Sequence, residues 1–315
     1  MDVRQLNALL AVEEHGGFSA AADALHTVQS NVSAHIARLE RELGVTLVDR
    51  QAGCLTHEGT IVAGRAQRIR YELEGVVADL AALRDRIVGT VRLGVIGSTA
   101  RWLVPRLLAA VSERHPGIRL VVVDATSASL EPRLLSGSLD LAVVNLPVPG
   151  HDLSSEELFT EDLVLVVPVD HHLANRDRVE FSDLSSVGLL MPPTGTAFRG
   201  ELDAAAAAAG LLLQPIAEVD GVRLIASLAT EGHGPAIVPA TAILGSRDRQ
   251  GWQVLVVNGL PPRRVGVAQR RRGLPTAPAR AVLDLLRGVT RAADDLTGLH
   301  PLTDARGGPT PGHAA

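Results

Sequence analysis

The sequence predicts a protein in which a small helical module and one long helix precede a larger α/β region. Residues 18–37 read as two helices joined by a tight turn, and apolar side chains repeat at helical spacing along residues 57–88. Apolar strands then alternate with helices over residues 90–292. The 315 residues are enough for more than one domain, and a hydrophobic fraction of 46% excludes a disordered or fibrous chain.

Composition excludes several classes of function. Aromatic residues make up 2% of the chain, too few for the stacking platforms that bind single-stranded nucleic acid. The single cysteine, Cys54, excludes a disulfide framework and a thiolate metal cluster. The first five residues lack the features of a secretory peptide, and no stretch approaches the ~20 apolar residues of a membrane span. We therefore expect a cytoplasmic protein without membrane contact.

Residues 1–58 carry three short helical patterns. Gly16 and Gly17 end the first, Ser19 is the expected N-cap of the second, and Thr27 is the expected N-cap of the third. The third helix has one apolar stripe, formed by Val28, Val32, Ile36, Leu39 and Leu43, and Gly44 follows it. Two helices separated by so short a turn predict a helix-turn-helix over residues 18–37.

The other face of the third helix is polar and small near its N-terminus. It carries Gln29, Ser30, Ser33, Ala34 and Ala37, with Asn31 on the flank. Gln and Asn side chains can hydrogen-bond adenine in the major groove, and a helix N-terminus attracts phosphate. This pattern favours a DNA-reading helix, and the alternative is an ordinary solvated helix face.

Residues 45–56 predict a short β-wing around the turn Gln51–Gly53. Arg50 at its base is placed to bind a phosphate, and the alternative is an ion pair with Asp49 or Glu42. Residues 1–60 contain four Arg and eight acidic residues, a net charge of -4. Because affinity for DNA depends on neutralising phosphates, a single module should bind poorly and needs a second copy.

Residues 57–88 read as one long helix, N-capped by Thr56 and ended by Gly89. Its apolar residues follow a heptad spacing: Val62, Ala66, Ile69, Leu73, Val76, Leu80, Leu83 and Ile87. Such a stripe has to be buried, and we expect the central five, Ile69 to Leu83, to pair with a second copy. The alternative is that the helix packs only on its own chain.

The remaining chain predicts an open α/β sheet, and residues 297–315 predict a disordered tail. The expected strands are Val91–Ile96, Ile118–Asp124, Leu139–Asn145, Leu163–Val167, Val187–Met191, Ile216–Val219, Ala236–Val238, Gln253–Val257 and Val265–Ala268. The expected helices are Ala100–Arg114, Ser129–Ser136, Phe198–Ala209, Gly221–Thr230 and Ala277–Ala293.

Small polar residues follow several of these strands. They are Gly97–Thr99, Ala125–Ser127, Asn145 and Pro193–Thr196. Ligands of open α/β sheets bind at the carboxyl ends of strands, and hydroxyl groups at helix starts favour a small polar or anionic ligand. Arg101 and Arg223 nearby also suggest an acidic ligand. The alternatives are that the loops are ordinary N-caps and that each arginine pairs with a local carboxylate.

Short segments spread through most of the chain match the pattern of one known protein family. In the head they are Gly17–Ala22, Leu25–Ser33, Ile36, Arg38–Glu40, Glu42–Val45, Leu47, Asp49–Arg50, Leu55–Thr56 and Gly59; beyond it they are Val91–Gly94, His115–Pro116, Gly137, Leu139–Val144, Gly232–Gly234 and Val238–Pro239. With these segments, residues 1 to about 292 resemble the LysR-type transcriptional regulators. Ala34 stands where the family often has Arg, and Gly53 and Cys54 stand where basic residues are common, which weakens the expected phosphate contacts.

The resemblance implies a winged helix-turn-helix, a dimerising linker helix at 57–88 and a two-lobed α/β effector domain at 90–292. That domain is similar to the type 2 periplasmic-binding-protein fold. Lobe I is expected at 90–163 and 269–292 and lobe II at 164–268, with crossings near Leu163–Pro168 and Val267–Gln269. The implied protein is a homodimer or homotetramer that binds double-stranded promoter DNA, contacts RNA polymerase and responds to a small-molecule effector between the lobes.

The resemblance also implies site residues. DNA contacts are expected from Thr27, Gln29, Ser30, Asn31, Ser33, His35, Arg38 and Arg50. Effector contacts are expected from Ser98, Thr99, Arg101, Thr126, Ser127, Asn145, Pro193, Thr194, Gly195, Thr196 and Val222.

Two other classes of function compete with this interpretation. One is a cytosolic small-molecule receptor with only weak DNA binding, which would use the lobes but not the helix-turn-helix. The other is an enzyme, against which stands the lack of a nucleophile elbow, a P-loop or a complete dinucleotide motif. The His171–His172 pair has no further ligands nearby in sequence, so we expect no metal, no cofactor and no catalytic residue.

Overall fold

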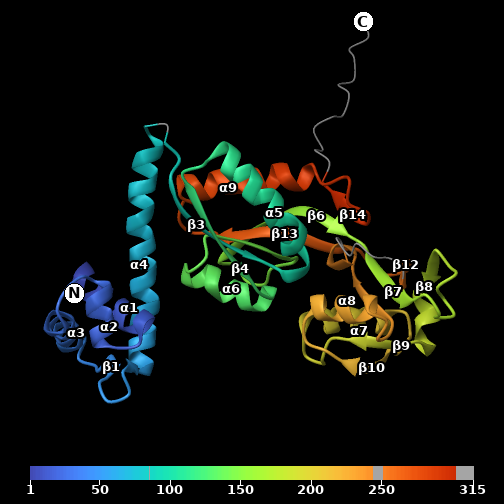
Figure 1. Cartoon of the computed structure of the whole chain (residues 1–315), viewed down its shortest axis with the longest axis horizontal. Helices are drawn as coiled ribbons and strands as arrows, with labels where there is room; N and C mark the ends of the chain where they lie inside the picture. Colours follow the sequence, from blue (N-terminus) through green and yellow to red (C-terminus); the bar gives the residue numbers. More distant parts are fainter. Residues whose placement is uncertain (85, 244–250, 303–315) are drawn as a thin grey trace, which may run out of the picture.

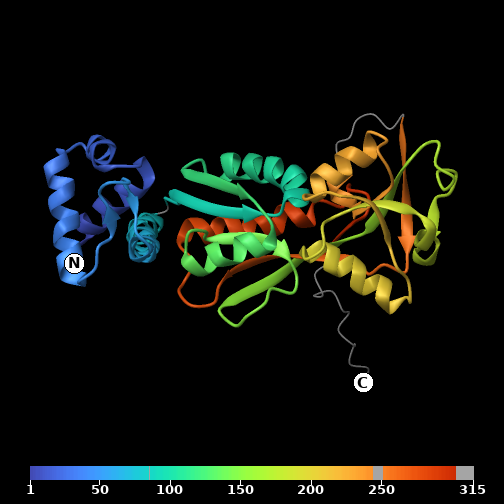
Figure 2. The same cartoon turned by 90° about the horizontal axis from the view of Figure 1, so that it is seen from below.

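The computed structural model describes residues 1–84, 86–243 and 251–302, and places three parts in succession (Figure 1). A helical head packs against one long helix, which leads into two α/β lobes. The view in Figure 2 shows the same order, with the long helix seen end-on between the head and the first lobe. None of the helices within the described ranges is long and apolar enough to span a membrane.

The head contains α1 (Val3–His15), α2 (Phe18–Ala24) and α3 (Gln29–Leu43), followed by a hairpin of β1 (Val48–Asp49) and β2 (Cys54–Leu55). The predicted helix ends are confirmed, because Gly16 and Gly44 adopt left-handed φ values of 74° and 72° that residues with a Cβ rarely take. Two predicted N-caps are wrong: Gly17 precedes α2 instead of Ser19, and Val28 precedes α3 instead of Thr27.

The long helix α4 (His57–Ala82) has the predicted N-cap, with Thr56 Oγ1 accepting a hydrogen bond from the Gly59 amide at 3.0 Å. It is shorter than expected. The helix ends at Ala82, Ile87 packs against the core of the first lobe, and Gly89 begins a strand. The predicted stripe is therefore divided: Val62 and Ala66 pack in the core of the head, Ile87 packs in lobe I, and the five residues from Ile69 to Leu83 lie between them.

Lobe I is a six-stranded sheet in the order β14-β6-β13-β5-β3-β4. Its strands are β3 (Gly89–Val95), β4 (Ile118–Asp124), β5 (Leu141–Asn145), β6 (Leu153–Glu161), β13 (Arg263–Arg270) and β14 (Leu299–Pro301). Figure 1 shows α5 (Gly97–Arg114) and α9 (Ala277–Arg291) on one side of this sheet and α6 (Ser127–Ser136) on the other. Because β3 lies parallel to both β4 and β5, the carboxyl ends of these three strands meet at one edge.

Lobe II is a second six-stranded sheet, in the order β10-β9-β11-β7-β12-β8. Its strands are β7 (Leu163–Pro168), β8 (Arg178–Glu180), β9 (Gly188–Met191), β10 (Gln214–Glu218), β11 (Ala236–Pro239) and β12 (Trp252–Asn258). It also contains α7 (Ala197–Ala208), α8 (Val222–Thr230) and the 3-10 helices η1 (Phe181–Ser186) and η2 (Ala240–Ile243). Two separate apolar clusters form its core, one on each side of the central strands.

Several predicted boundaries are wrong. The chain crosses to lobe II at Asp162, just before the predicted crossing Leu163–Pro168, which forms strand β7 of lobe II. The return crossing precedes residue 263 and does not lie near Val267–Gln269, because β13 pairs with β5 and β6. β6 and β8 were not predicted, because their sequences are largely polar. β14 lies in the tail expected to be disordered; the rest of that tail, residues 303–315, lies outside the described residues.

Candidate nucleic-acid interface and interlobe junction

The first turn of α3 is an exposed polar surface. Gln29, Ser30 and Asn31 are exposed, while Val32 and Ile36 on the other side of the helix are fully buried in the head. Asn31 donates its amide to Thr27 Oγ1 at 3.0 Å, whereas Gln29 and Ser30 make no side-chain hydrogen bond to any described residue. Of the predicted readers in this turn, Gln29 and Ser30 therefore keep their hydrogen-bonding groups available.

Arg50 joins the wing to α3. Its Nη1 donates to Ser33 Oγ at 3.1 Å, and its Nη2 lies 3.8 Å from a carboxylate oxygen of Glu40. The guanidinium also lies 5.5 Å from the centre of the Phe18 ring, a distance at which cation–π attraction operates. Arg50 thus makes an ion pair, but with neither of the carboxylates proposed from the sequence, and its side chain remains 52% exposed.

Those two carboxylates have other roles. Asp49 Oδ1 accepts hydrogen bonds from the amides of Ala52 and Gln51, which closes the wing turn and lowers the pKa of Asp49. Glu42 bonds the N-terminal amino group and Gln5. Of the other predicted DNA contacts, Arg38 is exposed and His35 is half-buried.

The linker helix α4 presents two opposite faces. Gly75 and Ala78 are buried against lobe I, where Arg92 stacks 3.7 Å from the centre of the Tyr71 ring and donates to Glu74 at 3.0 Å. The predicted dimerisation residues lie on the other face and are 39% to 82% exposed: Ile69, Leu73, Val76, Leu80 and Leu83. The helix does pack on its own chain, but this contact leaves the five residues from Ile69 to Leu83 uncovered.

The predicted effector residues of lobe I lie at the carboxyl ends of β3, β4 and β5. Ser127 Oγ accepts the Asn145 amide at 3.0 Å, and Thr126 Oγ1 caps α6 as an ordinary N-cap does. The Thr99 hydroxyl is buried without a hydrogen-bond partner among the described residues, and so is the side-chain oxygen of Asn145. Buried polar atoms are normally hydrogen-bonded, so these two oxygens lack a contact that such atoms usually make.

A buried charge network crosses from lobe I to lobe II. Arg263 at the start of β13 pairs with Glu161 at the end of β6 and donates to Ser98 Oγ at 2.7 Å. Glu161 also accepts from the hydroxyl of Thr241 in η2 at 2.5 Å. Glu161 is fully buried and Arg263 nearly so. Ser98, a predicted effector contact, is thus already hydrogen-bonded within lobe I, and the contact that crosses to lobe II is the one between Glu161 and Thr241.

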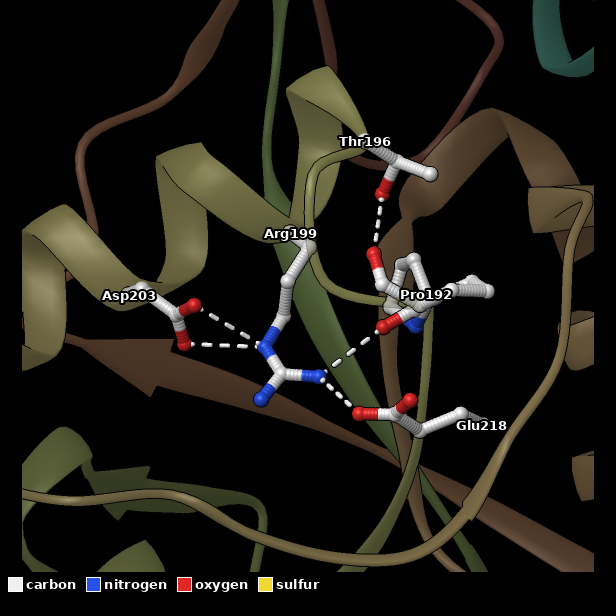
Figure 3. Close-up of polar contacts among 6 residues, drawn as sticks. Pro192, Thr196, Arg199, Asp203 and Glu218 are labelled. Atoms are coloured by element: carbon white, nitrogen blue, oxygen red, sulfur yellow. Dashed lines mark hydrogen bonds and ion pairs between the residues drawn. The ribbon is translucent and has the colours of Figure 1, made fainter.

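In lobe II, buried Arg199 bonds Pro192, the residue that precedes the predicted effector loop 193–196 (Figure 3). Its Nη1 donates to the Pro192 carbonyl at 3.0 Å and to Glu218 at 2.8 Å, and its Nε donates to Asp203 at 2.9 Å. Thr196 Oγ1 closes the loop by donating to the Pro193 carbonyl at 2.9 Å. Thr194 and Gly195 are exposed at the loop tip.

Arg223, next to predicted contact Val222, reaches across the junction from α8. Its guanidinium lies 2.8 Å from the Asp124 carboxylate at the end of β4 in lobe I. Arg223 therefore pairs with a carboxylate, which was the alternative to an acidic ligand, although this carboxylate belongs to the other lobe. Arg101 is exposed and makes no polar contact to the described part of the chain.

Two family models match the chain. Residues 3–60 match the model of bacterial regulatory helix-turn-helix proteins of the lysR family, and residues 84–291 match the LysR substrate binding domain. The chain belongs to the LysR family. It is 31% identical over 292 residues to a probable hydrogen peroxide-inducible genes activator of Streptomyces viridosporus, covering 91% of this chain and 94% of that protein.

Two solved structures show the same fold. A full-length OxyR of Pseudomonas aeruginosa, with one cysteine replaced by aspartate, has a TM-score of 0.74 at 21% identity and covers 96% of this chain and 99% of its own. CbnR in complex with its target DNA has a TM-score of 0.69 at 24% identity, with 92% and 100% covered. This LysR-family chain is a DNA-binding transcriptional regulator, as the sequence predicted.

Several residues of the junction were not predicted from the sequence. Asp124, Glu161, Arg263 and Arg199 make the contacts described above, yet only Asp124 carried a signal, as a carboxylate at the end of a predicted strand. Glu161 and Arg263 are 102 positions apart, and the pairing of β6 with β13 that brings them together could not be read from either segment alone.

Proposed function

We propose that this regulator binds double-stranded promoter DNA as a homodimer or homotetramer whose subunits pair along α4. The exposed heptad stripe of α4 carries the proposal, because burial of such a stripe is a main driving force for association. Pairing also supplies the second head that a module of net charge -4 requires. Two α3 helices would then enter successive major grooves about 34–36 Å apart.

The control signal in this proposal is a small molecule bound at the junction of the lobes. The unpartnered buried oxygens of Thr99 and Asn145 support it, as does the position of both residues at the carboxyl ends of strands. A ligand that binds one arrangement of the lobes more tightly shifts the protein towards that arrangement. The complete proposal places the protein in the cytoplasm, in contact with RNA polymerase and without enzymatic activity.

A peroxide response is the second candidate, because the Streptomyces relative is described as hydrogen peroxide-inducible. An intramolecular disulfide needs two cysteines, and this chain has one, Cys54, which is exposed in the wing. An intramolecular disulfide switch is therefore impossible in this chain. The lack of a second cysteine favours a bound effector over disulfide formation as the signal.

The α4 stripe provides the decisive experiment. Leu73→Asp combined with Leu80→Asp should convert the full-length protein to monomers in analytical ultracentrifugation, because two carboxylates would have to be buried in the pairing surface. Gel shifts with a fragment of the promoter of the protein's own gene should then show that the double variant binds at least about tenfold more weakly than the wild type.

Leu212→Asp is the matched control. Leu212 is 84% exposed on lobe II, far from α4 in the sequence, and its substitution should change neither mass nor DNA affinity. A double variant that remains oligomeric, or a wild-type protein that does not distinguish its promoter from random duplex, would contradict the proposal.

A further inference from the structure

We infer that the Arg223–Asp124 ion pair is an electrostatic latch between the lobes and that a small oxyanion, a carboxylate or a phosphate, opens it by replacing Asp124 at Arg223. The inference rests on the proposed function in placing the effector at this junction. It adds the residue that competes with the ligand and the contact between the lobes that the ligand breaks.

The first observation is that the pair joins the two lobes. Asp124 ends β4 in lobe I, and Arg223 lies in the first turn of α8 in lobe II, with 2.8 Å between their charged atoms. Close by, α5 of lobe I lies against α8 and η2 of lobe II. Separating the lobes here would therefore break the pair, and breaking the pair would loosen the junction.

The second observation is the position of the guanidinium at the N-terminus of α5. A Cβ built on Gly97, the first residue of α5, would lie 3.0 Å from Arg223 Nε and 3.0 Å from Asp124 Oδ1. The lack of a side chain at Gly97 thus gives both charged groups room against the helix end. No side chain caps this helix, since its N-cap is Ile96.

The guanidinium of Arg223, beside the N-terminus of α5, needs an anion nearby to offset its charge. The N-terminus of an 18-residue helix carries a partial positive charge and unpaired amides, so the guanidinium and the helix repel each other unless an anion lies between or beside them. Asp124 supplies that charge in this structure. An oxyanion could take its place because it would gain the same guanidinium and the same helix N-terminus.

The third observation is a buried, unpartnered hydroxyl in the same turn of α5. The Thr99 hydroxyl, in the same first turn of α5, is completely buried and has no partner among the described residues. Arg223 and Asp124 are 59% and 35% exposed, so the latch is weak enough to be opened. Arg223 becomes a ligand-binding residue in this scheme, and Asp124 is its competitor.

The test uses thermal unfolding of the full-length protein in sodium phosphate and in sodium acetate, each against sodium chloride of equal ionic strength. Asp124→Asn removes the competing charge, and we expect its apparent affinity for at least one of the two anions to rise by up to about fivefold, the size of an exposed ion pair. Arg223→Gln should abolish the response. The anion that acts distinguishes a phosphate ligand from a carboxylate ligand.

A second ion pair serves as the matched control. Arg106 and Asp295 form an exposed pair at 2.9 Å, and both lie in the part of the chain that forms lobe I. Asp295→Asn should leave the anion response at the wild-type level. A response of Asp124→Asn equal to wild type, or one retained in Arg223→Gln, would overturn the latch. Promoter binding of the same preparations is measured separately, and its failure in the wild type would contradict the proposed function instead.

Discussion

Hydrogen bonding within the head separates the predicted DNA readers into two groups. Asn31 and Ser33 are engaged by Thr27 and Arg50, so a base would have to compete for them. Gln29 is exposed and without a side-chain partner in the described structure. A glutamine side chain with both of its groups available can make two hydrogen bonds to adenine in the major groove. Gln29 is therefore the residue from which base specificity should be tested first.

Gln29→Ala should relax base preference rather than weaken binding uniformly. Loss of a bidentate contact should cost roughly 1–3 kcal/mol on the preferred site and little on random duplex. Competition gel shifts with single-base variants of the promoter fragment measure the difference. Gln253→Ala, which removes an exposed glutamine in lobe II, is the control and should change neither affinity. An equal loss on all sequences would exclude Gln29 as a base reader.

At the scale of elements, α4 shows how one helix serves two contacts. The apolar spacing of the sequence predicted the stripe, but it gave no sign that the opposite face would dock on lobe I. That face depends on small residues: a Cβ on Gly75 would lie 2.8 Å from the methyl group of Thr276. Thr276 has little freedom to move, because its hydroxyl caps α9. Gly75 therefore permits a close approach that no heptad pattern reveals.

Gly75→Ala should lower the stability of the full-length protein despite the better helix propensity of alanine. Gly64→Ala in the same helix is the matched control, since a Cβ there meets nothing within 4 Å. We expect Gly64→Ala to raise the free energy of unfolding by up to about 1 kcal/mol and Gly75→Ala to lower it by a similar amount. Chemical denaturation measures both. Stabilisation by both substitutions would show that α4 does not dock tightly on lobe I.

At the scale of the whole molecule, the sequence predicted the order of the parts better than the way they join. Runs such as Leu120–Val123 and the turn after α2 mark strands and helices locally, so the head, the long helix and most strands were found. The return crossing was misplaced because the short apolar run Val265–Ala268 within β13 could belong to the sheet of either lobe. Membership in a sheet is decided by pairing with distant strands, here β5 and β6, which local pattern does not encode.

The same limit applies to the buried network that joins the lobes. Serine, threonine, arginine and glutamate are common surface residues, and only the fold shows that Glu161 is fully buried with Arg263 beside it. Removing one member of a buried ion pair leaves the other charge without compensation. The free energy of unfolding should therefore depend on this pair, although neither residue lies in an apolar core cluster.

Arg263→Met should destabilise the protein by about 3–5 kcal/mol, because Glu161 would stay buried and unpaired. The double variant Arg263→Met with Glu161→Gln should recover a large part of that loss, since a neutral amide is far less costly to bury than a carboxylate and can still bond Thr241. Chemical denaturation of the single and double variants measures the coupling. Arg106→Met, which breaks an exposed pair within lobe I, should cost no more than about 1 kcal/mol. If the double variant were as unstable as the single one, the buried charge of Glu161 would not be the cause, and the loss would have to come from the packing of the Arg263 side chain alone.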